Sequence, residues 1–349
     1  MKNRMWDVMP TRNAGPVFAL AILFSGLPLR AYGQAKVDKD SGEIRRFEYA
    51  GRIYQVAFSP DGKLIATDHQ VWEVATGKKV ATLPVPALDR RPFRLAFSPD
   101  SRHIAAHRYY DIVLVEAATG KEVWRVELRE RGNANEDTPA LAFTPDGKQL
   151  LTARNDEALV RVWAAATGKE IRSFRFDINN GGLFGVKVWS FGVSADAQRV
   201  VVHSAPAGHL GGPVVLAFET GKELHRYQVS AEEDWVRFSA PSPDGHQFAY
   251  ARKDALHLMD LKTGKEVRKF DVAGTYVAFS SDGKHIAASV RAAGRDDDWV
   301  QCWEAATGKS VRLFKGHTGQ ITSLVFSPDG EHILSGGEDK TARLWRLKE

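Results

Sequence analysis

Cysteine is almost absent from this chain of 349 residues, and the one that occurs, Cys302, cannot form an intrachain disulfide. Stability must therefore come from packing and from closure of the fold. Cys302 directly precedes Trp303 in an apolar run, which indicates an inert thiol in the core. No window carries the 3.6-residue apolar period of a convincing amphipathic helix. An all-β fold is therefore favoured.

Motifs with local chemistry are also missing. The eleven histidines show no H-x-x-x-H or comparable spacing of metal ligands, and neither a nucleophile elbow nor a phosphate-binding loop occurs. His103, His285 and His332 recur at one position of a repeat, three residues after an aspartate, which favours a scaffold role. We predict no catalytic residue, no metal ligand and no cofactor. A site assembled from several distant segments would leave no local motif.

An apolar run near the start of the chain is short and follows basic residues. Lys2, Arg4 and Arg12 precede VFALAILFSGL (17–27), and a small-x-small site follows at residues 31–33. This layout is typical of a secretory signal peptide. Eleven apolar residues fall short of the roughly 20 that a membrane-spanning helix needs, so a retained membrane anchor is the weaker alternative.

Three segments are expected from this layout: a signal peptide at 1–33, a linker at 34–40 and a folded domain at 41–349. The expected protein is exported, either periplasmic or secreted, and has no membrane span after cleavage. Loss of four basic residues and one acidic residue with the leader lowers the formal net charge from +5 to +2. No cluster of lysine or arginine remains, so no nucleic-acid partner is expected.

Two short turn signals recur along the folded domain. The first is F-S-P-D-G or a close relative, and its seven copies end at Gly62, Ser101, Gly147, Ala197, Gly245, Gly283 and Gly330. The second is T-G-K, with six glycines at 77, 120, 168, 221, 264 and 308. Pro presets φ, Asp hydrogen-bonds the backbone two residues on, and Gly accepts a positive φ, so both signals predict tight turns.

Short β-rich runs such as IYQVAF, KLIATD, VQCWEA and EVRKF lie between these turns and predict strands of four to six residues. A period of roughly 45 residues that holds four such strands is the signature of a propeller blade. The fold class that we predict is an all-β, seven-bladed β-propeller with four antiparallel strands per blade.

The last repeat resembles a known family. GHTGQITSLVFSPDGEHILSGGEDKTARLW (316–345) is similar to a nearly complete WD repeat, and weaker copies extend the resemblance over residues 41–349. The resemblance implies a hydrogen-bonded structural tetrad of His317, Ser335, Asp339 and Trp345, which stabilises the blade and implies no catalysis. The other copies depart from this pattern, because Val115, Leu216 and Met259 replace the strand-end tryptophan. Most blades must therefore be held by apolar packing.

The repeat order predicts how the ring closes. Each repeat contains an inner strand, two middle strands and an outer strand, but the last one ends at Glu349 without its outer strand. The stretch EIRRFEYAG (43–51) aligns without a gap on EVRKFDVAG (266–274), which follows a T-G-K turn. We therefore expect residues 43–47 to supply the missing strand, so that the two chain ends share the seventh blade.

Length variation indicates which face of the ring contacts a partner. Propeller strands alternate in direction, so both kinds of turn lie on one face and all other loops on the opposite face. Intervals from the turn aspartate to the next T-G-K glycine run from 16 to 26 residues, and those from that glycine to the next aspartate from 18 to 28. Because binding residues gather on variable loops of a rigid scaffold, we expect the loop-rich face to be the interaction surface.

The candidate interaction residues on this face are acidic and aromatic side chains with one arginine, a mixture suited to a protein, peptide or cationic partner. They are Tyr109, Tyr110, Glu136, Asp137, Glu232, Glu233, Asp234, Trp235, Arg295, Asp296, Asp297, Asp298 and Trp299. The alternative is that these acidic loops are only solvated. Three adjacent carboxylates at 296–298 without a loop-specific ligand pattern are weak evidence for a divalent cation.

One enzymatic alternative has a basis in the sequence. VLVEAATGKEVWRVEL (113–128) resembles a blade of the pyrroloquinoline-quinone dehydrogenases, in which a T-G-K-x-x-W motif docks a tryptophan between blades. Only Trp124 fits that motif, and alignment of the other copies places Val80, Ile171, Leu224, Val267 and Val311 opposite it. The alternative is thus a propeller hydrolase or quinone-dependent oxidoreductase with its site at the central channel.

The favoured function is a non-catalytic scaffold or binding module of the cell envelope or extracellular space. Its expected partner is a protein or peptide, and the chain itself is expected to be a monomer that is not an enzyme. Fold and function separate in this architecture, so the sequence does not identify the partner.

Overall fold

The computed structural model describes twelve ranges of the chain: 42–84, 94–108, 111–128, 140–154, 159–175, 186–194, 196–206, 213–226, 238–251, 255–272, 274–291 and 297–347. All of them belong to one compact unit, Lys36–Glu349. The expected boundaries of the leader and linker, 1–33 and 34–40, lie outside these ranges. No helix within the described ranges has the length and apolarity needed to cross a membrane.

The described residues form 28 β-strands in seven four-stranded antiparallel sheets. Four of the sheets are blade 1, β2 (Val56–Phe58), β3 (Leu64–Thr67), β4 (Gln70–Glu73), β5 (Lys79–Thr82); blade 2, β6 (Arg94–Phe97), β7 (His103–Arg108), β8 (Asp111–Glu116), β9 (Glu122–Glu127); blade 3, β10 (Ala140–Phe143), β11 (Gln149–Arg154), β12 (Leu159–Ala164), β13 (Glu170–Arg175); and blade 4, β14 (Val186–Val193), β15 (Arg199–Pro206), β16 (Pro213–Ala217), β17 (Glu223–Arg226).

The other three sheets include the one that joins the chain ends. They are blade 5, β18 (Phe238–Pro241), β19 (Gln247–Ala251), β20 (Leu256–Asp260), β21 (Glu266–Phe270); blade 6, β22 (Gly274–Phe279), β23 (His285–Arg291), β24 (Asp298–Glu304), β25 (Ser310–Phe314); and blade 7, β26 (Ile321–Phe326), β27 (His332–Gly337), β28 (Thr341–Arg346), β1 (Glu43–Glu48).

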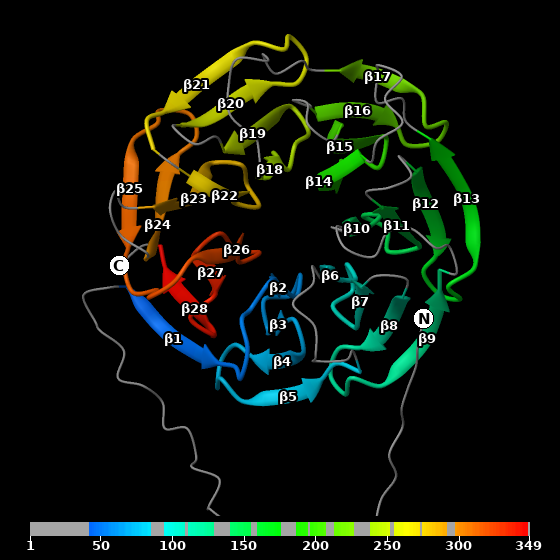
Figure 1. Ribbon diagram of the computed structural model, residues 1–349, viewed down its shortest axis with the longest axis horizontal. Coiled ribbons are helices and arrows are strands. Elements are labelled where there is room, and N and C mark those ends of the chain that lie inside the picture. Colours follow the sequence, from blue (N-terminus) through cyan, green and yellow to red (C-terminus); the bar gives the residue numbers. More distant parts are fainter. Residues whose placement is uncertain are drawn as a thin grey trace, which may run out of the picture. The chain divides into compact units, whose positions relative to one another are not determined.

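The seven sheets form a closed ring of blades (Figure 1). Each inner strand contacts the inner strand of the next blade, and β2 of blade 1 contacts β26 of blade 7. The blue strand β1 lies beside the red strand β28, on the outside of blade 7 (Figure 1). The predicted seven-bladed, all-β propeller is therefore confirmed, including its closure by the strand at residues 43–48.

The F-S-P-D-G turns are held by their own side chains. The Ser59 hydroxyl donates to Oδ1 of Asp61 at 2.6 Å and accepts the N–H of Leu64 at 2.8 Å, while Asp61 accepts the N–H of Lys63 at 3.1 Å. The same hydroxyl-to-aspartate bond recurs in the other six blades, from Ser98, Thr144, Ser194, Ser242, Ser280 and Ser327. The side chains that hold each turn are thus close together in sequence, which explains why the repeat can be recognised from the sequence.

A positive φ follows each of these aspartates. Five turns place glycine there, with φ of +69° to +72°, and Ser101 and Ala197 adopt φ of +62° and +54° where glycine is missing. The hydroxyl hydrogen bond is the main cause that lowers the pKa of Asp100, Asp146 and Asp196.

In blades 2 and 6 the recurring histidines begin the second strand, where His103 faces Glu116 and His285 faces Glu304 across the sheet.

The T-G-K glycines provide both a turn and close packing between blades. Gly168 has φ of +68°, and a Cβ at this position would lie 2.8 Å from the Trp124 ring of the preceding blade. Gly221 has φ of +69°, and its Cβ would lie 2.5 Å from the Phe174 ring. A side chain at either position would therefore both strain the backbone and displace an aromatic ring.

The residue that docks between blades is one position later than the sequence alignment placed it. Trp124 faces Leu114 across the sheet, and the residues in the same register of the other blades are Arg45, Ala81, Arg172, His225, Arg268 and Arg312. Trp124 Nε1 donates to the Ala165 carbonyl at 2.8 Å, whereas Arg172 and Arg268 donate to the Phe218 and Ala306 carbonyls at 2.7 and 2.6 Å. In blades 3 and 5, the guanidinium groups of Arg172 and Arg268 thus donate to a carbonyl of the next blade, as the Trp124 indole does in blade 2.

Apolar side chains fill the spaces between blades. Between blades 3 and 4, for example, Leu151 and Val162 pack with Val200, Val202 and Leu216, all of them without solvent exposure. At about 25 cal/mol per Å² of buried apolar area, these interfaces are the main stabilising contribution. Cys302 is buried between blades 6 and 7, and burial raises the pKa of its thiol to about 12, so the inert-thiol prediction agrees with its surroundings.

Candidate functional site

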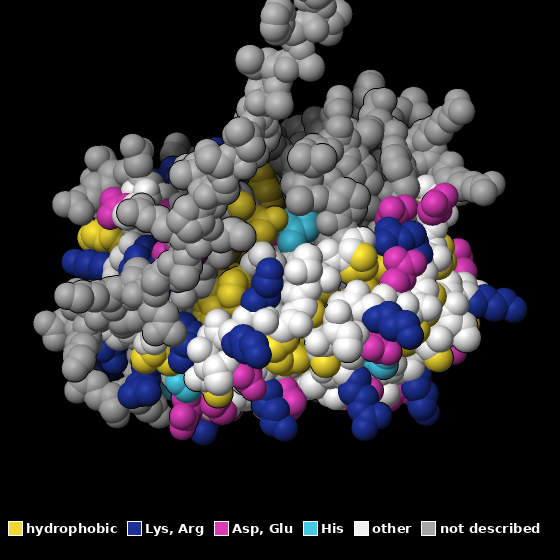
Figure 2. Space-filling view, turned by 90° about the horizontal axis from the view of Figure 1, so that it is seen from below, with side chains coloured by type: hydrophobic (Ala, Val, Ile, Leu, Met, Phe, Trp, Pro, Cys, Tyr) yellow, Lys and Arg dark blue, Asp and Glu magenta, His cyan; other side chains and the backbone are white. Residues whose placement is uncertain are grey.

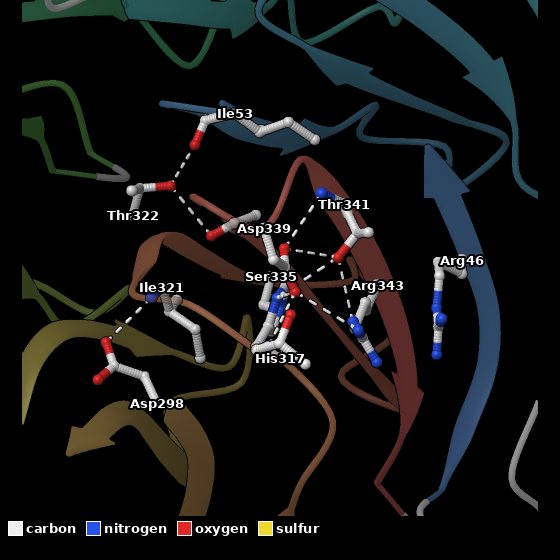
Figure 3. Close-up of polar contacts among 12 residues, drawn as sticks. Arg46, Ile53, Asp298, His317, Ile321, Thr322, Ser335, Asp339, Thr341 and Arg343 are labelled. Carbon is white, nitrogen blue, oxygen red and sulfur yellow. Dashed lines mark hydrogen bonds and ion pairs between the residues drawn. The ribbon is translucent and has the colours of Figure 1, made fainter. Parts of the chain in front are cut away.

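The four residues of the expected tetrad meet in blade 7. Figure 3 shows His317, Ser335 and Asp339 side by side. Trp345 Nε1 donates to the Ser335 hydroxyl at 2.8 Å, that hydroxyl lies 2.7 Å from His317 Nε2, and His317 Nδ1 lies 2.9 Å from Asp339 Oδ2. Trp345 and Ser335 come from β28 and β27, whereas His317 lies on the link from blade 6. The tetrad therefore ties the inner link, two strands and one loop together.

The electrostatics assign a donor to each of these bonds. Burial lowers the pKa of His317, so its ring is neutral at pH 7. Although burial opposes ionisation of Asp339, hydrogen bonds from His317, Thr341 and the Thr318 N–H hold its pKa well below its usual range. Nδ1–H of His317 accordingly donates to an ionised Asp339, and Nε2 accepts from Ser335. A histidine with both nitrogens committed in this way serves neither as a metal ligand nor as a general base.

Half of this arrangement recurs in blade 3. Trp163 Nε1 donates to Thr152 Oγ1 at 2.9 Å, and Thr152 is the counterpart of Ser335 in the repeat. In blade 1 the indole nitrogen of Trp72 is buried without a hydrogen-bond partner among the residues that the structure describes. Apolar packing must therefore hold that blade, as the sequence predicts for most of the copies.

Truncation of the tetrad hydroxyl is expected to destabilise the protein more than truncation of its counterpart. Ser335→Ala leaves both the Trp345 N–H and the His317 Nε2 buried without a partner, which costs about 3 kcal/mol of unfolding free energy. Thr152→Ala, the matched control, leaves a single indole N–H and costs about 1 kcal/mol. Urea unfolding followed by tryptophan fluorescence measures both. Equal losses in the two variants would contradict a structural role for the tetrad.

A buried ion-pair network joins the tetrad to the closing strand. Arg343 Nη1 lies 2.7 Å from Glu43 Oε2, and both side chains are less than 5% exposed. Arg343 also lies 3.4 Å from Asp339 and donates to Thr341 (Figure 3). Arg46 on β1 lies 2.9 Å from the other oxygen of Glu43. The guanidinium of Arg343 therefore links the tetrad aspartate to the strand that closes the ring.

Most of the candidate interaction residues lie outside the described ranges. These are Tyr109, Tyr110, Glu136, Asp137, Glu232, Glu233, Asp234, Trp235, Arg295 and Asp296. Asp297, Asp298 and Trp299 are described; Asp297 precedes β24, and Asp298 and Trp299 begin it. The Trp299 indole donates to Asp297 at 3.2 Å, and Lys315 Nζ lies 4.3 Å from the centre of its ring.

Asp298 has a buried side chain that is bonded to two other residues of the protein. Its side chain is 3% exposed, Oδ1 lies 3.2 Å from Arg291 Nε, and Oδ2 accepts the N–H of Ile321 at 2.9 Å (Figure 3). Because Ile321 begins blade 7, this carboxylate joins blade 6 to blade 7. Both of its oxygens have protein partners, so Asp298 is poorly placed to contact another molecule.

Further polar groups connect the inner strands near the closure. Thr322 Oγ1 donates to the Ile53 carbonyl, and the Ser323 hydroxyl accepts the N–H of Val56 at 3.1 Å, so blade 7 is joined to blade 1 (Figure 3). Gln55 exchanges two hydrogen bonds with the backbone of Leu95, which joins blade 1 to blade 2. Sequence reasoning missed these residues, since no motif marks them.

A buried carboxylate lies in the loop between β3 and β4. Asp68 accepts the N–H groups of Tyr54 at 2.6 Å and Gln55 at 2.7 Å. Burial raises the pKa of Asp68 to about 7, and those N–H groups and the charge of Arg94 oppose the shift. A carboxyl with this pKa could act as an acid or base, but both oxygens of Asp68 already accept backbone N–H groups. Asp68 therefore fixes the link into blade 1.

One group of potential metal ligands occurs among the described residues. Asp329, Glu331 and His332 offer ligand atoms within 4.8 Å of one another on the first turn of blade 7. Asp329 already accepts the Ser327 hydroxyl and the N–H of Glu331, as its counterparts do in every blade. The group is thus part of the turn.

Two family models match the chain. The model described as WD domain, G-beta repeat matches residues 308–346, which contain the tetrad strands. The model described as outer membrane protein assembly factor BamB matches residues 51–314, which cover blades 1 to 6 and include the Trp124 motif. The two matched ranges overlap at residues 308–314, just before the nearly complete WD repeat at 316–345.

Known proteins with similar sequences have diverse names. The chain is 22% identical to a guanine nucleotide-binding protein subunit beta of Zea mays, over 85% of this chain and 81% of that protein. It is 22% identical to a serine-threonine kinase receptor-associated protein of Mus musculus, over 95% of this chain and 79% of that protein. Nuclear distribution protein nudF 2 of Penicillium rubens is 29% identical over 36% of this chain.

The match to the nuclear distribution proteins is partial, since the chain covers 32% of the length of nudF 2 and 39% of a PAC1 protein of Coccidioides posadasii. None of the names given above denotes an enzyme, and the comparison bears out the prediction of a non-catalytic protein.

The prediction of an exported, periplasmic or secreted protein is wrong, because these relatives are intracellular proteins. The apolar run at 17–27, from which export was predicted, lies outside the described residues. Eleven apolar residues after three basic ones are a short compositional pattern. They carry less information about the protein's setting than repeats that align along 85% of the chain with a relative.

The closed ring of seven blades, the tetrad geometry of blade 7 and the two family models agree. The chain belongs to the WD-repeat family of β-propellers and, through residues 51–314, to the propeller family whose model is described as outer membrane protein assembly factor BamB.

Proposed function

We propose that this chain is a non-catalytic protein-interaction scaffold that contacts its partner through the loop-rich face. The observation that carries the proposal is the contrast between the two faces. The seven first turns are nearly identical and are hydrogen-bonded within themselves, whereas the connections of varying length join the strands at their opposite ends. Variable loops on a rigid scaffold are the usual carriers of recognition.

Two further observations support a protein partner. One relative is named as a subunit and another as a receptor-associated protein, so propellers of this kind take part in assemblies. The insertions also carry the acids and aromatics that suit a protein or peptide surface, including Trp235 and the acidic run at 232–234. On the side of the ring seen in Figure 2, Lys and Arg alternate with Asp and Glu along one rim, which favours solubility over binding.

Charge neutralisation on one face at a time tests the proposal. One variant carries Glu232→Gln, Glu233→Gln and Asp234→Asn, and a second carries Asp296→Asn and Asp297→Asn. The control, Lys148→Gln with Lys284→Gln, changes exposed turn residues of the other face. Asp298 is left intact because it joins two blades.

Affinity capture from a lysate of the source organism, quantified by mass spectrometry, is the readout. We expect at least one of the two loop variants to retain about tenfold less of the partner than the wild type, and the control to retain it fully. All variants should keep the wild-type melting temperature. Survival of the same partners in both loop variants would show that the contact surface lies elsewhere.

A further inference from the structure

A cavity of about 540 Å³ lies between blades 4 and 5 and includes both of their first turns. Its apolar wall includes Val201 and Val215 of blade 4 and Leu261 of blade 5. Residues from the first turns, Ser194 and Ser242, and from the T-G-K turn, Lys262, place the cavity on the face with the regular turns. It is therefore separate from the loop-rich face that the proposed function uses.

The cavity coincides with a thinly packed junction. The buried apolar core here consists of Val201, Val215, Phe248 and Tyr250, whereas ten such residues fill the junction between blades 3 and 4, counted over the described ranges. His225 occupies the docking position that Trp124 and Arg172 hold in blades 2 and 3. An imidazole is shorter than an indole or a guanidinium chain, so it fills less of the space between blades.

Basic side chains converge on this junction. Arg199, His225, His246 and Lys262 line the cavity, and no carboxylate is among its described lining residues. Lys262 stands where blades 1, 2, 3 and 6 have alanine in the same turn. Arg199 faces Ala217 across the sheet, at the register where His103 and His285 face a glutamate.

The nearest turn carboxylates are already committed. Asp196 accepts the Ser194 hydroxyl at 2.5 Å and the N–H of Gln198 at 2.9 Å, and Asp244 makes the same two bonds to Ser242 and to the N–H of His246. The cavity thus combines apolar walls with the charged side chains of Arg199 and Lys262, and no carboxylate is among its described lining residues. Asp196 lies near Arg199, outside that lining.

We propose that this cavity binds a small organic anion that has an apolar body and a carboxylate or sulfonate group. Its volume lies within the roughly 300–1,000 Å³ of small-molecule sites, and apolar walls with a few polar groups are typical of them. Arg199 and Lys262 supply charge-assisted hydrogen bonds to the anionic group. The apolar body packs against Val201, Val215 and Leu224, the last of which is 51% exposed.

Fluorescence titration of the full chain with 8-anilinonaphthalene-1-sulfonate tests this site. The wild type should show saturable binding of one probe molecule. Arg199→Ala combined with Lys262→Ala should weaken binding about tenfold or more, because two cations are lost. Leu224→Glu, at an exposed position, should weaken it as well without affecting the fold. N-phenyl-1-naphthylamine, which has no sulfonate, should bind the wild type and the double variant equally.

Lys148→Ala combined with Lys284→Ala is the matched control, since it removes two turn lysines that do not line the cavity. It should bind the sulfonate as the wild type does. Each variant is melted in parallel, because an expanded chain binds this probe without a formed site. Unsaturable binding by the folded wild type, or equal affinity of the wild type, the double variant and Leu224→Glu, would overturn the proposal.

Discussion

Deletion of residues 41–48 is expected to unfold the ring or to make it aggregate. These residues include β1, which pairs with β28 at five positions from Glu43–Trp345 to Glu48–Thr341. Phe47 of β1 is 3% exposed and packs in the cluster between blades 7 and 1. Five strand residues at about 1 kcal/mol each and a buried Phe at about 2 kcal/mol are a large share of a typical total stability of 5–15 kcal/mol.

The deletion also exposes β28 as a new sheet edge. An unpaired edge presents free N–H and C=O groups to other chains, so soluble aggregates are expected even where the remaining blades stay folded. Size-exclusion chromatography with light scattering measures the monomer, and circular dichroism gives the melting temperature. Deletion of residues 34–40, which precede the strand, is the control and should change neither.

A peptide of residues 41–50 added in trans should restore part of the monomer and raise the melting temperature of the deletion variant. The peptide can reoccupy the edge of β28 because that edge needs only an extended partner. A deletion variant that remains monomeric with an unchanged melting temperature would mean that the ring does not depend on its closing strand.

Glu43→Ala is expected to lower the unfolding free energy by about 3 kcal/mol, because it leaves the buried Arg343 guanidinium without its nearest counter-charge. Arg343 keeps its longer contact with Asp339 at 3.4 Å, so the variant should still fold. Glu48→Ala is the matched control on the same strand. Glu48 is exposed, and its truncation should change the stability by less than about 0.5 kcal/mol.

The double variant Glu43→Met with Arg343→Met separates the charge effect from packing. Replacement of both members of a buried ion pair by apolar side chains is often neutral, so it should recover most of the stability that Glu43→Ala loses. Chemical unfolding of the single and double variants in a thermodynamic cycle measures the coupling. If Glu43→Ala and Glu48→Ala were equally stable, the buried pair would contribute nothing to closure.

The repeat pattern predicted the ring because the turns are built from neighbours in sequence. Ser59, Asp61 and Lys63 form the side-chain hydrogen bonds of a turn among themselves, and the same three positions recur seven times. The closing strand was also predictable, since EIRRF at 43–47 has the composition of an outer strand and the last repeat lacks one. In both cases the physical signal is short-range and repeated.

Contacts between blades were much less predictable. The docking residue was predicted one position too early in the other copies of the repeat, although Trp124, Arg172 and Arg268 each stand four residues after a T-G-K glycine. Arg172 and Arg268 therefore escaped notice as substitutes for Trp124. Asp298 has the composition of an exposed acidic loop, and only its bond to Ile321 in the next blade identifies it as structural.

Strand order, blade number, turn chemistry and the partner of the first strand follow from the amino acids alone, because each depends on residues close together or on a pattern copied along the chain. Tertiary structure decided the rest. The ion pair of Glu43 with Arg343 spans 300 positions, and the cavity beside Arg199 exists only where two particular blades meet. Such features arise from packing between distant segments, for which the sequence has no local signal.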